Sequence, residues 1–463
     1  MRPLVVFLLG WSTFAILTSP TYGEEPQLKP RLLVLTDIST WEPDDSESLV
    51  RLLVYADRFE IEGLVLTTGW SMDRVRDDFL DLLHDAIDAY ETDLPHLMAR
   101  SERNEPCADE APQSLGEWPS PRYLKSRTVI GSRRRGAEHV GPGNDSDGSD
   151  LIIRLVDEDD ERPLWISVWG GGNTLAQAIW RVRQDRTSDE LDRFLSRLRG
   201  YAITDQDREQ RTPFSDSSHL TLRREYGRRL FLIWDESAWK YHNGHGRELW
   251  SDYETHVQGH GALGAIYPKY VYGVEGDTPA FLHLLPQGLN DPNVPTHGGW
   301  GGYFEWGPTE DGETECLNNH RPPASSISRS IEETFYPEMF ADFAARMDWA
   351  RDGKGNRNPR LAIGDDRSPE IVELNPRVGS TITLDMTRSL DPDGDHLTFA
   401  CRPLETTGGY QGTFETVEEE AGRFRIKVPA DASGKELHLI CRAIDDGTPS
   451  LVGYRRVILR PID

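Results

Sequence analysis

Four carboxylate side chains crowd into one short stretch near the start of this chain. Asp37, Glu42, Asp44 and Asp45 fall within nine positions, in the segment TDISTWEPDD. Carboxylates this close repel one another unless a cation lies among them, and a hard cation such as calcium prefers oxygen ligands. An acid beside such a metal can take a proton from water as a general base. The stretch therefore has two interpretations: a metal-dependent hydrolytic site, or a solvated loop whose acids cap a helix.

Alternating strands and helices are expected on either side of these acids. Residues 31–37 form an apolar run after Pro30, which predicts a buried strand, and 48–59 carry leucines at helical spacing. The apolar run 61–68 completes a β-α-β unit, and such units form parallel sheets. Because the pattern recurs, we expect an α/β domain over 28–350, with a mostly parallel sheet and flanking helices.

The ends of the expected strands carry a distinctive set of residues. In open α/β sheets, ligands bind outside the carboxyl ends of the strands. We therefore expect a binding site at this edge of the sheet. The residues at these ends are Asp37, Thr67, Thr68, Trp169, Asp205 and Asp207.

Four segments, in order along the chain, resemble motifs of the nucleoside hydrolases. The acids of 37–45 resemble the family's D-x-x-x-D-D signature after the first strand, with a gap three residues longer. GLVLTTGW (63–70) and WGGGNTLAQAI (169–179) are similar to its second-strand motif and to a later turn and helix. GDTPAFL (276–282) resembles its late H-D-P-x-A motif.

A closer resemblance covers nearly the whole chain. Segments such as PLWISVWGGGNTLAQA and YPKYVYGVEGDTPAFLHLLPQGLNDP are similar to those of an exported bacterial family described as cellulose-binding. Its members combine a nucleoside-hydrolase-like domain with a C-terminal immunoglobulin-like domain. The resemblance implies the same arrangement for this chain.

The nucleoside-hydrolase resemblance implies a calcium ion and a role for each matching residue. Asp37 would be a calcium ligand and the base that activates water. Asp45, Asp277 and the main-chain carbonyl of Trp169 would be further calcium ligands. Asp44 would hold a sugar hydroxyl.

The substrate side of the resemblance is less regular. Asp205 and Asp207 fall where the family has an acid and an Asn that contact the sugar. Trp70 replaces the Asn that binds a sugar hydroxyl, so its ring would stack on a sugar or block the pocket. Gly276 replaces a His linked to leaving-group protonation in some members, which leaves the general acid open. Other acids, chosen by residue type alone, are Glu42, His260 and Glu305.

The sequence changes character after the α/β pattern. Residues 351–360 are rich in Gly, Asn and charge and predict a linker, and 361–463 show short alternating strands typical of a β-sandwich. Cys401 and Cys441 each lie in a predicted strand. The sequence leaves open whether they form a bridge between two sheets. DPDGD at 391–395 fits either a calcium-binding loop or a tight turn.

An aromatic segment lies late in the α/β domain. Trp300, Tyr303 and Trp306 occur among glycines in 290–306. Aromatic rings pack on the apolar faces of sugars, so these side chains predict either a sugar-stacking surface or a loop that closes the core.

Charge and the N-terminus limit the partners. The net charge of −27, from 51 basic and 78 acidic residues, argues against a nucleic-acid partner, which requires basic side chains. Residues 1–23 have an Arg, an apolar run and small residues, which predicts a secretory signal peptide; an uncleaved anchor is the alternative. We expect an exported protein that does not interact with membranes after cleavage.

Three functions fit these observations. The first is a calcium-dependent hydrolase of a glycosyl bond, acting on an N-ribosyl compound or a related sugar. The second is a carbohydrate-binding protein, for cellulose or another plant polysaccharide, with little or no catalysis. The third is a structural module in which the acidic site only rigidifies the fold.

Overall fold

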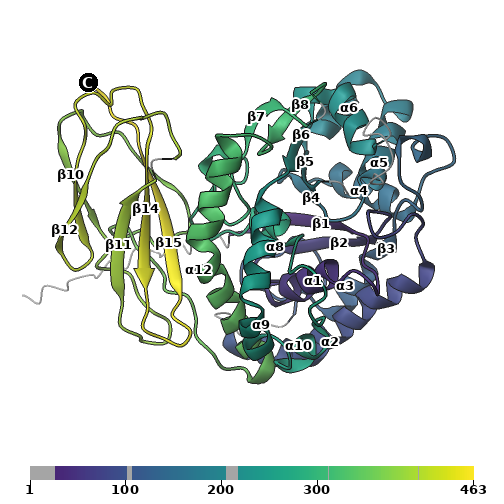
Figure 1. The fold of residues 1–463 in the computed structure, drawn as a ribbon, viewed down its shortest axis with the longest axis horizontal. Coiled ribbons are helices and arrows are strands. Elements are labelled where there is room, and N and C mark those ends of the chain that lie inside the picture. The colour runs from purple at the N-terminus through teal and green to yellow at the C-terminus, as the bar shows by residue number, and fades with distance from the viewer. Residues whose placement is uncertain (1–26, 102–106, 205–216, 311, 405) are drawn as a thin grey trace, which may run out of the picture.

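The structure, a computed structural model, describes residues 27–101, 107–204, 217–310, 312–404 and 406–463. Its N-terminal part is an α/β domain around an eight-stranded sheet, and its C-terminal part is all-β (Figure 1). The predicted fold class, a mostly parallel sheet with flanking helices followed by an all-β region, is confirmed. The predicted signal peptide lies outside the described residues. Within them, no helix has both the length and the apolarity needed to cross a membrane.

The sheet of the α/β domain is parallel except at one edge. Its strands are β1 (Arg31–Thr36), β2 (Glu60–Leu66), β3 (Thr128–Ile130), β4 (Leu164–Val168), β5 (Leu198–Ile203), β6 (Phe231–Asp235), β7 (Glu305–Pro308) and β8 (Glu315–Asn318). They lie in the order β3-β2-β1-β4-β5-β6-β8-β7, and only the pair β7 and β8 is antiparallel among the pairings of this sheet. The strand order reverses beside β1, and open α/β sheets bind ligands at such a switch point.

Helices cover both faces of this sheet. They are α1 (Asp44–Val54), α2 (Leu80–Arg100), α3 (Pro121–Ser126), α4 (Asp147–Asp157), α5 (Asn173–Asp185), α6 (Ser188–Ser196), α7 (Ser218–Tyr226), α8 (Ala238–Glu248), α9 (Trp250–His256), α10 (Gly261–Ile266), α11 (Thr278–Leu282) and α12 (Ala324–Asp352). Leu32 and Val34 of β1 pack in a core with α1, α2 and α12, whereas Leu33 and Leu35 pack in a second core with α4, α5 and α6. Alternate residues of a strand face opposite sides, which explains why this strand is apolar throughout.

The C-terminal domain consists of two sheets that share one core. One sheet has the order β10-β13-β12 and the other β11-β14-β15-β9. The strands are β9 (Val372–Leu374), β10 (Thr381–Asp385), β11 (Thr398–Pro403), β12 (Thr416–Glu420), β13 (Arg423–Lys427), β14 (Leu437–Ile444) and β15 (Val452–Leu459). Leu384, Phe424 and Val457, from both sheets, belong to a single apolar cluster, as in a sandwich. The immunoglobulin-like class of this domain stays a prediction.

The two cysteines of this domain lie in the same sheet. Cys401 on β11 and Cys441 on β14 occupy facing positions of neighbouring antiparallel strands, and their Sγ atoms are 3.1 Å apart. The idea that they bridge two sheets is therefore wrong, because the order of the strands makes them neighbours within one.

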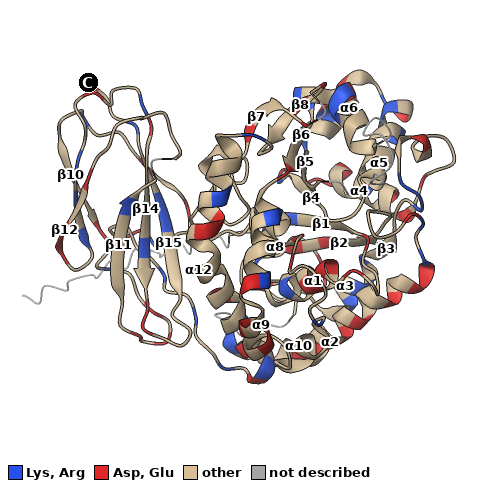
Figure 2. Ribbon diagram, in the orientation of Figure 1, with Lys and Arg blue, Asp and Glu red and all other residues tan. Residues whose placement is uncertain are grey.

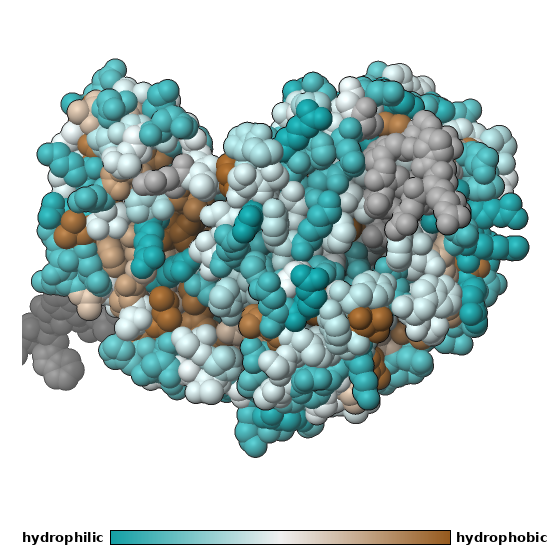
Figure 3. All heavy atoms as spheres, viewed as in Figure 1, coloured by the Kyte–Doolittle hydropathy of each residue, from teal (hydrophilic) through white to brown (hydrophobic). Residues whose placement is uncertain are grey.

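The two domains are tied together by buried polar contacts. Arg456 on β15 donates hydrogen bonds to the carbonyl oxygens of Leu289, His297 and Gly298, at 2.5–2.8 Å. Arg442 on β14 pairs with Glu338 of α12 at 2.9 Å. Figure 2 shows basic residues on β14 and β15, the strands nearest α12. Figure 3 shows the two domains as two lobes with a notch between them.

The aromatic loop before β7 contributes to the core near this junction. Trp300 is buried and packs edge-on against Tyr454 of β15, with ring centroids 5.9 Å apart, and Tyr303 is also buried. Trp306 is half-buried, with the guanidinium of Arg228 3.9 Å from its ring centroid. The core interpretation is confirmed for Trp300 and Tyr303, so they do not form a sugar-stacking surface.

Candidate metal centre

Two chain segments bring acidic side chains to the carboxyl end of β1. The strand ends at Thr36, and α1 begins at Asp44, whose first turn also contains Asp45. Acids are favourable in this position because the helix dipole places positive charge at its N-terminus. Asp277 comes from a distant part of the chain and immediately precedes α11.

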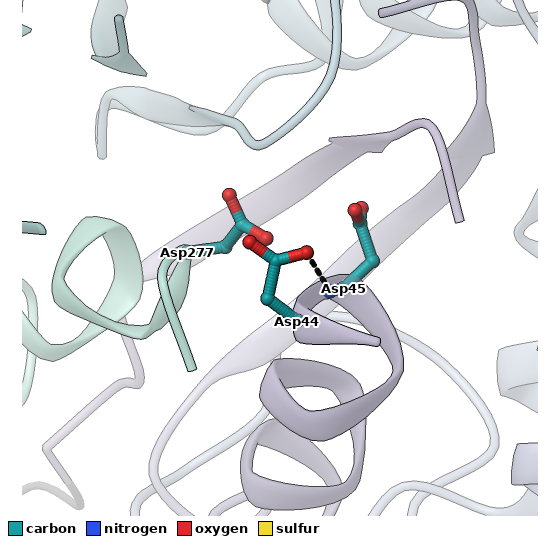
Figure 4. Close-up of side chains that lie close together, drawn as sticks. All are labelled: Asp44, Asp45 and Asp277. Carbon is teal, nitrogen blue, oxygen red and sulfur yellow. Dashed lines mark hydrogen bonds between the residues drawn. The ribbon is translucent and has the colours of Figure 1, made fainter. Parts of the chain in front are cut away.

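These three acids form one compact group, which we call the sheet-edge cluster: Asp44, Asp45 and Asp277. One carboxylate oxygen from each lies within 4.8 Å of the other two. Figure 4 shows the three side chains close together. Thr36 Oγ1 donates a hydrogen bond to Asp45 Oδ1, which orients that side chain. Asp277 Oδ2 is buried and has no hydrogen-bond partner. Calcium is bound by groups of oxygens of this kind.

The charges of the cluster are not compensated by basic side chains. Burial raises the pKa of Asp44 to about 6. Burial, followed by the charges of neighbouring acids, raises the pKa values of Asp45 and Asp277 well above the usual range. Among the described residues, no Lys or Arg forms an ion pair with any of the three. Buried carboxylates without a counter-charge are costly, so the donor set fits a divalent cation.

Asp37 lies next to this cluster and is held tightly. The main-chain N–H of Ser71 donates to Asp37 Oδ2 at 2.8 Å, and the Ser71 hydroxyl donates to the Asp37 carbonyl at 2.7 Å. A Cβ on Gly69 or on Gly170 would fall within 3.0 Å of Asp37 atoms, so both glycines are needed for this packing. Burial raises the pKa of Asp37 to about 7. Its charge also contributes to the raised pKa of Asp45 and Asp277.

Asp37 is not among the three acids that meet within 4.8 Å, although the sequence predicted it as a metal ligand. Asp44, predicted to hold a sugar hydroxyl, is instead the third acid of this group. Trp169 follows β4, and its N–H donates to the Leu35 carbonyl at 2.8 Å, which places its main chain beside the end of β1. The roles of Asp37, Asp44, Asp45, Asp277 and the Trp169 carbonyl stay predictions. The predicted sugar contacts Asp205 and Asp207 lie outside the described residues.

Three exposed aromatic residues lie on the loops that carry or contact the acids, and we call them the aromatic rim: Trp41, Trp70 and Tyr272. Their exposed fractions are 47%, 40% and 47%. Trp41 precedes Glu42 and donates from Nε1 to the Ser71 carbonyl at 3.0 Å, while Tyr272 is hydrogen-bonded to Glu42. Trp70 lies between Gly69 and Ser71, the two residues that contact Asp37. Exposed rings around a polar site suit a sugar, which offers apolar faces and hydroxyls.

The sequence identified one member of this rim and missed two. Trp70 was found because it replaces a sugar-binding Asn in the resemblance. A signal for Trp41 was present, since it stands beside Glu42 and Pro43 in an acidic loop; in the structure its ring packs on Phe79, with centroids 5.1 Å apart, and stays about half exposed. For Tyr272 the sequence carries no comparable signal, because its neighbours Tyr270 and Val271 are also apolar.

The three residues considered as the general acid lie in different surroundings in the structure. Glu42 lies beside the cluster, and burial followed by the charges of Asp44 and Asp37 raises its pKa to about 9. His260 faces Asp348 of α12 at 3.3 Å, and Glu305 accepts a hydrogen bond from Tyr303 at 2.7 Å. Of these three, Glu42 is the one beside the acids.

Two family models match parts of this chain. A family model described as "Cellulose-binding Sde182, nucleoside hydrolase-like domain" matches residues 31–304. A second, described as "Cellulose-binding protein Sde0182, C-terminal domain", matches residues 381–461. No curated protein matches the chain.

One of the matching solved structures is similar over nearly the whole chain. A nucleoside hydrolase-related hypothetical protein from Saccharophagus degradans, described as associated with carbohydrate metabolism, is 33% identical, with a TM-score of 0.79. The match covers 94% of this chain and 100% of that protein. The effector protein XOO4466 also matches, at 12% identity over 70% of this chain and 95% of its own, but its TM-score of 0.31 supports no inference. The chain therefore belongs to the Sde182 family of cellulose-binding proteins with a nucleoside hydrolase-like domain.

Proposed function

We propose that the sheet-edge cluster binds calcium and that this site, with its aromatic rim, hydrolyses a glycosyl bond of a sugar substrate. The observation that carries the proposal is Asp277 Oδ2, a buried oxygen without a hydrogen-bond partner on an acid that lies close to Asp44 and Asp45. A structural acid cluster would be expected to satisfy that oxygen with a donor.

The acids divide into two roles. Asp44, Asp45 and Asp277 would hold the cation, with the Trp169 carbonyl as the predicted further ligand. Bound there, calcium would neutralise the carboxylates and lower the pKa of a coordinated water. Asp37 would take the proton of the attacking water, because the Ser71 N–H fixes its carboxylate and its side chain adjoins the cluster. The water oxygen would then bond to the anomeric carbon as the bond to the leaving group breaks, and the leaving group would depart with that electron pair and take a proton from solvent.

The surroundings of the site bear on the substrate. A Cβ at Gly276 would lie 2.9 Å from Asp44 Oδ2, so this chain has little room for the family's His at that position. The leaving group would therefore not be protonated from residue 276, which distinguishes the site from those nucleoside hydrolases that use the His. Trp41, Trp70 and Tyr272 favour a sugar or a sugar chain that stacks on exposed rings.

A carbohydrate-binding protein without catalysis is the second candidate. The exposed rim supports it, as does the description of the family as cellulose-binding. In that case the acids would bind sugar hydroxyls or a structural cation, and Asp37 would have no reaction to assist.

The test is calcium titration into chelator-stripped protein, combined with hydrolysis of nucleosides and aryl glycosides. We expect saturable binding that Asp45→Asn weakens strongly and Asp81→Asn leaves unchanged, since Asp81 is an exposed acid in the first turn of α2. Hydrolysis should require calcium and Asp37. Unaltered calcium affinity in Asp45→Asn would refute the metal site. Cellulose binding without hydrolysis of any substrate would favour the second candidate.

A further inference from the structure

A second group of acids lies where the linker meets the C-terminal domain. The loop 391–395 precedes β11, and the loop 445–447 follows β14. The main-chain N–H of His396 donates to Asp446 Oδ1 at 2.8 Å, which joins the two loops. Asn356, in the linker after α12, donates from its side-chain amide to the carbonyl oxygen of Pro449 at 2.9 Å. In Figure 1 the chain leaves α12 and enters the C-terminal domain at the end where β14 finishes.

Both loops use one carboxylate oxygen for their own turn and leave the other unpaired. Asp391 Oδ1 accepts the N–H groups of Asp393 at 2.7 Å and Asp395 at 3.1 Å, whereas Asp391 Oδ2 is buried without a partner. Asp445 Oδ1 accepts the N–H groups of Gly447 at 3.0 Å and Leu451 at 2.9 Å. Its Oδ2 is also unpaired, and the residue is only 4% exposed. A tight turn explains the first oxygen of each acid but not the second.

The acids around these oxygens lie close to one another. A Cβ on Gly447 would fall within 3.0 Å of Asp395 Oδ2 and of the Asn356 amide, so the loops and the linker are in contact. Burial, and then the charge of Asp391, raises the pKa of Asp445, while the N–H groups of Leu451 and Gly447 and the nearby Asn356 amide act to lower it. The same two causes raise the pKa of Asp395.

One acid of the DPDGD loop is neutralised, and the others are not. Asp393 pairs with Arg100 of α2 at 2.6 Å and with Arg357 of the linker at 2.8 Å. Within the described ranges, no ion pair involves Asp391, Asp395 or Asp445. The arginines thus tie the loop to the α/β domain and leave a group of uncompensated carboxylates behind it.

We propose that Asp391, Asp395 and Asp445, which we call the junction cluster, bind a second calcium ion that fixes the linker and the end of the sandwich. Calcium suits the site because every donor is an oxygen and because calcium tolerates irregular geometry. Unlike the sheet-edge cluster, these three acids do not all approach within 4.8 Å, so binding should draw the two loops together. The role is structural, and it is separate from the proposed hydrolysis.

The experiment uses the full chain with the sheet-edge cluster silenced by Asp45→Asn and Asp277→Asn. After chelator treatment, calcium titration should still show one binding event, and calcium should raise the thermal unfolding temperature. Adding Asp391→Asn or Asp445→Asn should weaken that binding at least tenfold and remove the thermal shift. Asp365→Asn, at an exposed acid of the same domain, should change neither. Asn keeps the oxygen that accepts the loop N–H groups, so both loops should still fold.

Two results would overturn the proposal. One is a silenced protein that binds no calcium, and the other is binding that neither Asp391→Asn nor Asp445→Asn changes. Should these variants unfold, hydrogen exchange of the silenced protein decides: calcium must slow exchange in 391–395 and 445–447, and equal rates with and without calcium refute the site.

Discussion

The two acidic clusters use the same residue type at loop ends, and their surroundings separate them. The carboxylates of the sheet-edge cluster meet within 4.8 Å at the strand-order switch point, and exposed aromatic residues lie on the neighbouring loops. Asp391 and Asp445 of the junction cluster each use one oxygen for a turn, and Arg100 of the α/β domain and Arg357 of the linker both pair with Asp393. An acidic motif alone therefore does not distinguish a substrate site from a structural one. The surrounding residues distinguish the two clusters. The aromatic rim and Asp37, which Ser71 holds in place, suggest a catalytic site, whereas Arg100 and Arg357 suggest a structural link between the domains.

The largest expected effect is the loss of turnover in Asp37→Asn. A general base contributes about 10²–10⁴-fold to a rate, so turnover should fall by that factor while the calcium affinity of the sheet-edge cluster changes little. Asp391→Asn should leave turnover unchanged. Steady-state rates at saturating calcium, with titration of the same samples, measure both. Equal losses in the two variants would break the distinction between the clusters.

A smaller effect should follow from moving Asp37 without replacing it. In Gly69→Ala the new Cβ would fall within 3.0 Å of the Asp37 carboxylate, so that side chain must shift. A displacement of about 1 Å at a catalytic group costs roughly 10²-fold in rate. Gly307→Ala is the matched control, because a Cβ there meets nothing within 4 Å. Full activity in Gly69→Ala, measured under the same conditions, would show that the position of Asp37 does not matter.

The pH dependence of stability should distinguish metal-free from calcium-loaded protein. Burial raises the folded pKa of Asp37 to about 7 and that of Asp44 to about 6, above their unfolded values near 4. The folded state therefore binds more protons than the unfolded state between these values, and stability is lost as pH rises from about 4 to 7. One pKa unit corresponds to about 1.4 kcal/mol, so the two raised pKa values together imply a loss on the order of 7 kcal/mol.

Urea unfolding at pH 5 and pH 8, with chelator and with calcium, tests this dependence. Calcium should flatten it, because a bound cation favours the ionised carboxylates. Asp44→Asn should reduce the slope in chelator, and the exposed Asp81→Asn should not. A metal-free protein that is equally stable at both pH values would contradict the buried, uncompensated charges.

The sequence predicted the strands and helices better than the contacts between distant segments. Residues 31–37 predict a strand because both faces of β1 are buried, and the helix after Pro43 follows from its acids and leucine spacing. Local patterns cannot show which distant loop arrives at a strand end, so Asp277 needed the family resemblance. The same limit applies to Cys401 and Cys441, whose pairing within one sheet depends on strand order.

Aromatic residues show most clearly why local sequence was insufficient. Trp300 lies among glycines in a polar loop, which suggested a binding surface, yet β15 of the other domain covers it. Tyr272 lies in a more apolar segment and is exposed. Burial of a ring is decided by the domain that packs over it, and that information is spread over the whole chain.

The smallest expected effect concerns the aromatic rim and compares it with the half-buried ring of Trp306. Stacking of an exposed ring contributes about 1 kcal/mol, so Trp70→Ala or Trp41→Ala should weaken binding of a soluble cello-oligosaccharide about fivefold. Trp306→Ala, at a half-buried ring stacked on Arg228, should leave the affinity unchanged. Unchanged affinity in both rim variants, measured by titration with folding verified by circular dichroism, would remove the rim from the binding site. A loss confined to Trp70→Ala would place the sugar on the Asp37 side of the site, because Trp70 lies between the two residues that contact Asp37.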